Sequence, residues 1–139
     1  MKVSEIMTKN PACCFTTTSL AEVARMMAEH NCGSIPVVDE HTKKKPIGTI
    51  TDRDITIRTV AHNKNPLEMV VGEVMTDNPI TIREDATFED CRAAMENAQI
   101  RRILVVDTSG HCIGMVAQAD IARKASEHET AVLVKDVSA

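Results

Sequence analysis

A hydroxyl followed by carboxylates marks the part of the sequence best suited to bind a ligand. Residues 48–55 read Gly-Thr-Ile-Thr-Asp-Arg-Asp-Ile. The apolar, β-branched start predicts the end of a buried strand, and Thr51 with the acids behind it predicts the start of a helix. At such a corner free backbone N–H groups attract anions, the Thr51 hydroxyl can bind a phosphate, and Asp54 can bind a sugar diol. Taken alone, the same pattern also fits an ordinary capped helix with surface acids.

The corner belongs to an internal repeat that spans most of the chain. The matching pairs of segments are 3–11 with 71–79, 35–39 with 103–107, and 48–55 with 114–121. The first two pairs are 68 residues apart, and two extra residues within 40–46 of the first copy change the register before the third pair. A register kept over so much of the chain indicates two copies of one structural unit.

Each copy predicts the same order of elements, β-α-β-β-α. A short helical turn at 3–7 or 71–75 is closed by Asn-Pro, because proline disfavours a helical conformation at the preceding residue. Capping boxes begin helices at Ser19 and Thr87, with apolar residues at helical spacing behind them. The expected strands are 12–15, 35–38 and 47–50 in the first copy and 80–82, 103–106 and 113–116 in the second. The expected final helices are 51–61 and 118–125.

Composition restricts the class of protein. The chain has 139 residues, enough for one compact domain or two closely packed half-domains. An apolar share of 43% and a charged share of 26% are typical of a soluble globular protein, and no apolar run reaches the length of a membrane span. Because the first residues lack the apolar core of a signal peptide, we expect a cytoplasmic protein with no membrane partner.

The rarer residue types argue against several kinds of site. Five cysteines, an odd number without C-x-x-C spacing, predict reduced thiols rather than disulfides or a metal site. A net charge of −4 with two Phe and neither Trp nor Tyr argues against nucleic acid as a partner. A flat base bound by this chain has to lie between aliphatic side chains, because aromatic rings are nearly absent.

Together the two copies resemble a tandem pair of CBS domains, or Bateman module, of the small stand-alone prokaryotic type. The resemblance covers the whole chain and rests on the corner residues Gly48, Thr51 and Asp54, on the Met-Thr-x-x-Pro starts and on Pro-Val-Val-Asp at 36–39. It implies an α+β fold in which two β-α-β-β-α halves pack sheet to sheet about a pseudo-twofold axis. It also implies two clefts between the halves that bind adenosine derivatives such as AMP, ADP or ATP. The expected divisions are CBS domain 1 at 1–62, a linker at 63–70, CBS domain 2 at 71–126 and a C-terminal extension at 127–139.

The resemblance assigns roles to the two corners. The corner aspartates, Asp54 and Asp120, are implied to bind ribose hydroxyls, and the corner hydroxyl, Thr51, is implied to bind phosphate. The second copy has Ala117 in place of that hydroxyl. Arg53, beside both acids of the first corner, is expected to reach a phosphate or to pair with the neighbouring acid.

Basic residues just before the strand of the opposite half complete the phosphate site in the family. The second copy has Arg101 and Arg102 there, and guanidinium groups suit phosphate oxygens, whereas the first copy has the uncharged Gly33 and Ser34. If the contacts come crosswise, the chain has one competent nucleotide site, at the first corner, and one weak or empty site. A solvated arginine pair at a strand entrance is the alternative interpretation.

The position of the base is implied by the family to be the first strand and the start of the second. The candidates for the first site are Ala12, Cys13, Ile35 and Pro36, and those for the other site are Ile80, Thr81, Ile103 and Leu104. Burial in the core, without any ligand, is the alternative for all of these.

Three functions of different classes remain open. The leading hypothesis is a non-catalytic sensor of AMP, ADP or ATP that needs no cofactor, forms a homodimer and acts on an unknown regulated protein. A structural dimerisation module with degenerate clefts, or a sensor of an S-adenosylmethionine-type ligand, is the alternative. Catalysis is disfavoured, because the histidines have no recognisable metal or nucleophile spacing and acids in a first helical turn are expected from the helix dipole.

Overall fold

The computed structural model describes residues 1–42 and 44–127. The first half contains the 3-10 helix η1 (Val3–Glu5), then β1 (Thr8–Lys9), α1 (Leu20–His30), β2 (Ser34–Val38), β3 (Pro46–Thr51) and α2 (Asp52–Arg58). The connection holds η2 (Val60–His62) and η3 (Pro66–Glu68). The second half contains η4 (Val71–Glu73), β4 (Thr76–Asp77), β5 (Thr81–Arg83), α3 (Phe88–Ala98), β6 (Arg102–Val106) and β7 (Cys112–Ala117), and residues 118–127 are helical. Residues 128–139, most of the expected C-terminal extension, lie outside the described residues.

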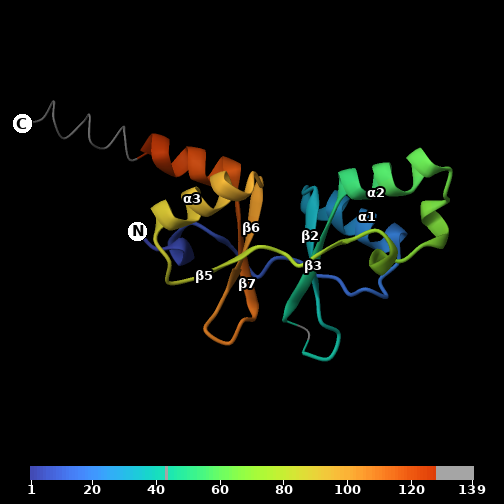
Figure 1. Ribbon diagram of the computed structural model, residues 1–139, viewed down its shortest axis with the longest axis horizontal. Helices are drawn as coiled ribbons and strands as arrows, with labels where there is room; N and C mark the ends of the chain where they lie inside the picture. The colour runs from blue at the N-terminus through green and yellow to red at the C-terminus, as the bar shows by residue number, and fades with distance from the viewer. Residues whose placement is uncertain (43, 128–139) are drawn as a thin grey trace, which may run out of the picture.

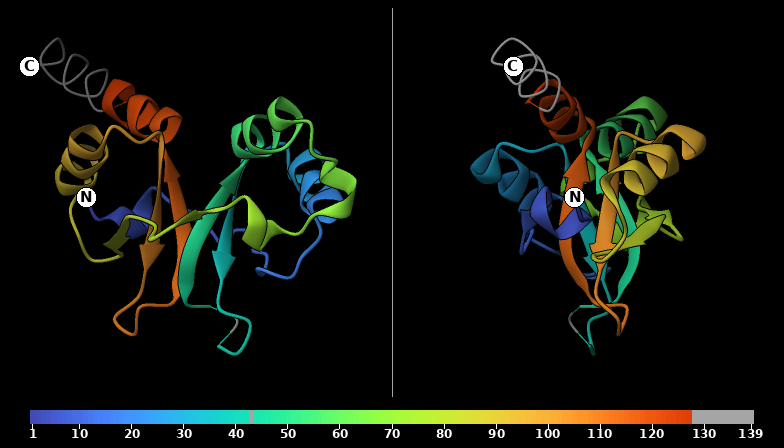
Figure 2. Two further views of the ribbon diagram at one scale, coloured as in Figure 1. Left: turned by 45° about the vertical axis from the view of Figure 1, so that its right-hand side comes forward. Right: turned by 90° about the vertical axis from the view of Figure 1, so that its left-hand side faces the viewer.

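Two sheets form the middle of the molecule. One has the strand order β2-β3-β4 and the other the order β1-β7-β6-β5. Figures 1 and 2 show the sheets facing each other, with α1 and α2 outside one sheet and α3 outside the other. The prediction of an α+β fold built from two similar halves that pack through their sheets is confirmed.

The longer helices form where the capping residues predict them. The Ser19 hydroxyl accepts a hydrogen bond from the Glu22 N–H at 3.1 Å and begins α1. At α3, Thr87 and Asp90 accept from each other's N–H in a reciprocal capping box. The apolar faces of both helices are buried against their own half, in two separate hydrophobic clusters. Local sequence therefore decides both helix starts and both buried faces.

The first residues of each copy pack on the other half of the molecule. Strand β1, from the first copy, pairs antiparallel with β7, and β4, from the second copy, pairs antiparallel with β3. The 3-10 helices η1 and η4, which precede these strands, also pack on the opposite half. Val3 is fully buried in the hydrophobic cluster of the second half, and Val71 is fully buried in that of the first. The halves are thus joined by two exchanged segments as well as by their facing sheets.

Glycine at both corners makes this exchange possible. Gly48 pairs with Asp77 across β3 and β4, and a Cβ atom placed on Gly48 would lie 2.6 Å from the Thr76 carbonyl oxygen. A Cβ atom on Gly114 would collide with Met7 in the same way. The close approach of the exchanged strand therefore requires a residue without a side chain.

Two predicted elements are shorter than expected. The strand expected at 12–15 is reduced to a single parallel bridge between Cys14 and Val37. The helix expected over 51–61 ends at Arg58 and continues as η2. The break lies at Thr59, whose φ of −121° and ψ of −74° are not helical and whose buried hydroxyl donates to the Ile55 carbonyl at 2.5 Å. No helix within 1–42 or 44–127 is long and apolar enough to cross a membrane.

Candidate functional site

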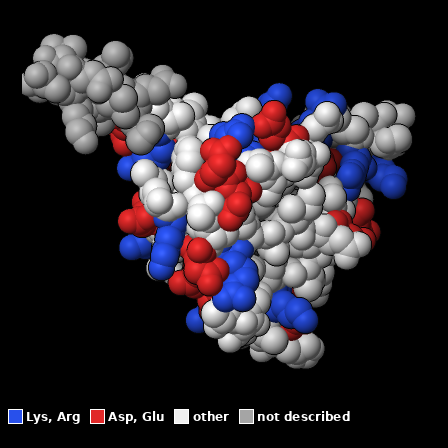
Figure 3. Space-filling view, turned by 60° about the vertical axis from the view of Figure 1, so that its left-hand side comes forward, with Lys and Arg blue, Asp and Glu red and all other residues white. Residues whose placement is uncertain are grey.

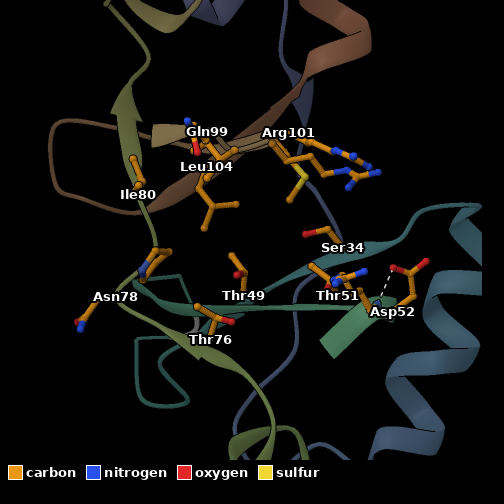
Figure 4. Close-up of a pocket in the computed structure, with 15 residues that line it drawn as sticks. Ser34, Thr49, Thr51, Asp52, Thr76, Asn78, Ile80, Gln99, Arg101 and Leu104 are labelled. Carbon is orange, nitrogen blue, oxygen red and sulfur yellow. Dashed lines mark hydrogen bonds between the residues drawn. The ribbon is translucent and has the colours of Figure 1, made fainter. Parts of the chain in front are cut away.

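A cavity of about 570 Å³ lies between the two halves, within the range typical of small-molecule sites. It is called here the first cavity, and Figure 4 shows its lining. Residues from the first half, the exchanged segment and the second half all contribute. They are Ser34, Thr49, Thr51, Asp52, Arg53, Thr76, Asn78, Pro79, Ile80, Gln99, Ile100, Arg101, Arg102, Leu104 and Met115.

One end of the first cavity holds cationic and hydroxyl groups together with the Asp52 carboxylate. Thr51, at the end of β3, and Arg53, in the first turn of α2, come from the first half. Arg101 and Arg102 come from the second half, where α3 has ended at Gln99 in a left-handed conformation and β6 begins. The structure thus brings Thr51 together with all three arginines, as the crosswise arrangement requires. Guanidinium groups and hydroxyls are good partners for phosphate oxygens.

The other end of the first cavity combines aliphatic and amide side chains. Figure 4 shows Ile80, Leu104, Asn78 and Gln99 at the opposite end from Asp52 and Thr51. Ile80 has 47% of its surface exposed. The amides of Asn78 and Gln99 line the same cavity and supply donors and acceptors.

A second cavity of about 590 Å³ occupies the pseudo-symmetric position. Its lining consists of Thr8, Lys9, Asn10, Pro11, Ala12, His30, Asn31, Cys32, Ser34, Ile35, Arg102, Met115, Ala117 and Asp120. Arg102, Ser34 and Met115 line both cavities. Ser34 and Ala117 line this cavity, as the crosswise arrangement requires, but Lys9 on the exchanged β1, Arg102 and His30 at the end of α1 line it too. That this site is weak or empty stays a prediction.

Comparison with known proteins assigns the chain to a family. The model of the CBS domain matches residues 3–58 and again residues 71–127. The chain belongs to the CBS-domain family. Each half described above is one CBS domain, and the two cavities lie between the domains of the pair.

Several relatives resemble the whole CBS pair. Protein MK0525 of Methanopyrus kandleri is 39% identical over 76% of this chain and 53% of its own length, so the chain spans about half of that relative. The CBS domain-containing protein YhcV of Bacillus subtilis is 34% identical over 93% of this chain and 89% of its own length. The CBS domain pair of protein MJ0100, solved with 5′-methylthioadenosine and S-adenosyl-L-methionine, is 33% identical with a TM-score of 0.77, over 88% of this chain and 98% of that pair.

The corner aspartate of the first CBS domain is engaged with its own helix. One Asp54 carboxylate oxygen accepts from the Thr51 N–H at 3.1 Å, while the Thr51 hydroxyl accepts from the Asp54 N–H at 2.9 Å. The other oxygen lies 3.7 Å from Arg58, and the side chain is only 15% exposed. Asp54 does not line the first cavity, whereas the neighbouring Asp52 does.

Arg58 links this corner to the exchanged segment. Its guanidinium donates to the Val74 carbonyl at 2.8 Å and to the Met75 carbonyl at 2.9 Å, and it also pairs with Asp54. These carbonyls come just before β4 and the residues that line the first cavity. Sequence analysis missed Arg58, because nothing local in the sequence places residues 58 and 74 together.

The corner aspartate of the second CBS domain lines its cavity. One Asp120 oxygen accepts from the Ala117 N–H at 2.9 Å, and the other pairs with Arg123 at 3.1 Å. The side chain is 16% exposed, as at the first corner, but Asp120 borders the second cavity. The two corners therefore differ: the Thr51 hydroxyl lines the first cavity with Asp52 and three arginines, whereas the Asp120 carboxylate lines the second cavity with Lys9 and Arg102.

Several of the residues expected to contact the base of the ligand line the opposite cavity from the one expected. Ala12 and Ile35 line the second cavity with Asp120, and not the first cavity with Thr51. The first cavity receives Ile80 and Leu104 instead. The cause is the exchange. Because β4 of the second copy pairs with β3, the segment 76–80 borders the first cavity, and because β1 of the first copy pairs with β7, the segment 8–12 borders the second. Cys13 and Pro36 line neither of the two cavities.

The charges around the cavities are mixed. Figure 3 shows acidic and basic side chains interspersed over the face in view, without an extended field of one sign. Within residues 1–42 and 44–127, no three His, Cys, Asp or Glu side chains are placed to bind a metal ion together. A functional assignment has to account for the two CBS domains, for the two cavities between them and for the three arginines at the first cavity.

Proposed function

We propose that this CBS pair is a non-catalytic regulatory module that binds an adenosine-containing ligand, with a phosphate-bearing nucleotide in the first cavity. The observation that supports this most is the convergence of Thr51, Arg53, Arg101 and Arg102 at one end of a cavity whose other end carries the aliphatic side chains of Ile80 and Leu104. A nucleotide has the same two ends. An anionic phosphate gains charge-assisted hydrogen bonds from guanidinium groups, and an uncharged base gains from aliphatic contact.

The adenosine part of the proposal draws on a relative. The MJ0100 CBS pair, a third identical to this chain, holds 5′-methylthioadenosine and S-adenosyl-L-methionine. Both contain adenosine and neither carries a phosphate. In the present chain, three arginines at the first cavity favour AMP, ADP or ATP over a sulfonium cation there. An S-adenosylmethionine-type ligand is the second candidate. It fits better at the second cavity, where the Asp120 carboxylate meets one arginine and one lysine, than at the first, where the Asp52 carboxylate meets three arginines.

Both CBS domains contribute residues to the first cavity, and this supports a regulatory role. Because Thr51 belongs to one CBS domain and Arg101 to the other, a bound phosphate contacts both, and it stabilises the arrangement in which they are close. We propose that this change is sensed by a separate protein.

A homodimer is part of the same proposal. Exposed aliphatic side chains gather on α2 and the connection that follows it, including Val60 at 59% exposure and Leu67 at 74%. Apolar side chains at such exposure are suited to contact a second subunit. The same observation supports the structural alternative, in which the chain dimerises without binding a ligand, so binding has to be measured directly.

The deciding experiment is titration of the purified protein with AMP, ATP, adenosine and S-adenosylmethionine by calorimetry. The chain has neither Trp nor Tyr, so a nucleotide retained through purification also dominates the near-ultraviolet spectrum and can be released by heat and identified. We expect AMP or ATP to bind more tightly than adenosine. Absence of binding by all four would leave the structural alternative, and tighter binding of adenosine than of AMP would refute the phosphate site. Sustained ATP turnover would refute the non-catalytic assignment.

A further inference from the structure

The two cavities have a wall in common. Ser34, Arg102 and Met115 line both the first and the second cavity. Ser34 begins β2 and Arg102 begins β6, and the two residues are 68 positions apart, so they are equivalent in the two copies of the repeat. Because Ser34 is an uncharged hydroxyl and Met115 is apolar, Arg102 is the one cation of these three shared residues.

Arg102 lies beside one corner and lines the cavity of the other. Across β6 and β7 it pairs with Ala117, whose N–H donates to Asp120 at 2.9 Å in the second corner. It also lines the first cavity together with Thr51 of the first corner. The Arg102 side chain is exposed and forms no ion pair within the described parts of the chain, so no carboxylate there holds the guanidinium at one cavity.

The other basic groups are divided between the cavities. Arg53 and Arg101 line only the first of the two, and Lys9 and His30 line only the second. A phosphate in one cavity that accepts hydrogen bonds from Arg102 withdraws those donors from the other cavity. If two phosphates approached the guanidinium together, their like charges would repel each other across it. Both arrangements make the second phosphate bind more weakly than the first.

We propose that Arg102 couples the two cavities negatively, so that a phosphate-bearing nucleotide in the first cavity weakens the binding of another in the second. The inference rests on the proposed function, because it starts from a phosphate bound in the first cavity. The coupling is reciprocal, as any coupling between two binding equilibria has to be. Loss of one charge-assisted hydrogen bond from Arg102 weakens the second binding step about tenfold. Adenosine has no phosphate, so its binding should show no such coupling.

Negative coupling determines which ligands the CBS pair holds together. Over a wide range of nucleotide concentration, the pair holds one phosphate-bearing ligand, and the second cavity remains open to an adenosine ligand without phosphate. The weak binding predicted for the second cavity then depends on the first cavity being filled. With the first cavity empty, Arg102 is available to the second, beside Lys9.

The test is an AMP titration of the full chain, followed by NMR of labelled isoleucine and alanine methyl groups. Ile80 lines only the first of the two cavities, whereas Ala12 and Ala117 line only the second, so each cavity reports its own affinity. In the parent protein we expect the Ile80 methyl to shift first and the two alanine methyls to shift at higher AMP concentration. The same titration with adenosine provides the uncharged comparison.

Variants that weaken the first cavity separate coupling from intrinsic weakness of the second. Arg53 and Arg101 are exposed and form no ion pair in the described ranges, so Arg53→Gln/Arg101→Gln should remain folded and lose AMP from the first cavity alone. The alanine methyls should then shift at about tenfold lower AMP concentration than in the parent. Adding Arg102→Gln should remove this gain. Arg25→Gln/Arg83→Gln, which makes the same change in net charge outside both cavities, should leave the parent values unchanged.

The outcomes distinguish the inference from the proposed function. If Ile80 responds to AMP but the alanine methyls titrate identically in the parent and in Arg53→Gln/Arg101→Gln, or do not respond in either, the inference is overturned and the proposed function stands. A gain that survives Arg102→Gln, or an equal gain with adenosine, also overturns it. An Ile80 methyl that AMP never shifts refutes the phosphate site of the proposed function and the coupling together.

Discussion

Replacing Arg101 by glutamine should separate phosphate recognition from recognition of the nucleoside. Arg101 lines the first cavity beside Thr51, is exposed, and forms no ion pair within the described residues. Its removal therefore leaves no partner uncompensated, and we expect the free energy of unfolding to change by less than about 0.5 kcal/mol. A charge-assisted hydrogen bond contributes about 1.5–3 kcal/mol, and the lower end applies to an exposed side chain. Arg101→Gln should thus weaken AMP binding about tenfold.

Calorimetry with AMP and with adenosine, on the parent and on Arg101→Gln, measures this effect. Adenosine lacks the phosphate, so its affinity should be the same for both proteins. Arg83→Gln is the matched control, because it makes the same change in net charge at an exposed arginine that pairs with Asp85 and lines neither cavity. An equal loss for adenosine and AMP would show that Arg101 does not contact the phosphate. An equal loss in Arg83→Gln would show that only the overall charge matters.

Three further predictions concern the corners and the loops. Asp54→Ala removes the hydrogen bond to the Thr51 N–H and the pair with Arg58, so the free energy of unfolding measured by urea should fall by about 1 kcal/mol; an unchanged value would contradict the capping role. Ala117→Thr adds the missing cap hydroxyl above Asp120 and should raise the same free energy by about 0.5–1 kcal/mol, whereas a lower value would show that the second corner does not accept this side chain. The carboxylates of Asp39 and Asp107 accept backbone N–H bonds, which lower each pKa below the ordinary 3.8 in the folded state. Their contribution to stability is therefore complete above about pH 4 and is lost as pH falls through the folded pKa, and NMR titration that gave values at or above 3.8 would refute this.

The two corners are similar in sequence but differ in structure. The resemblance to the family implied that Asp54 binds ribose hydroxyls. The structure shows both of its oxygens occupied, one by the Thr51 N–H and the other near Arg58. Arg58 is held in turn by carbonyls of the exchanged segment, which lies in the other copy of the repeat. A role that depends on a contact between residues 58 and 74 has no local signal in the sequence.

The local elements were predictable because their causes are local. The cap at Ser19, the reciprocal cap at Thr87 and the apolar spacing behind each act within a few residues, and both helices begin where these signals place them. The repeat likewise predicted two similar halves and an α+β fold, since equal sequences favour equal structures. The pairing of Thr51 with Arg101 and Arg102 across the halves was also anticipated, from the resemblance to the family.

Only the tertiary structure decided which copy supplies which wall of each cavity. The starts of the two copies, at Val3 and Val71, are nearly identical, so either could pack on either half and the sequence pattern is the same in both cases. The outcome depends on the length of the connections and on the space left at Gly48 and Gly114 for the exchanged strands. These are properties of the folded chain. They place Ile80 rather than Ala12 in the cavity that Thr51 lines.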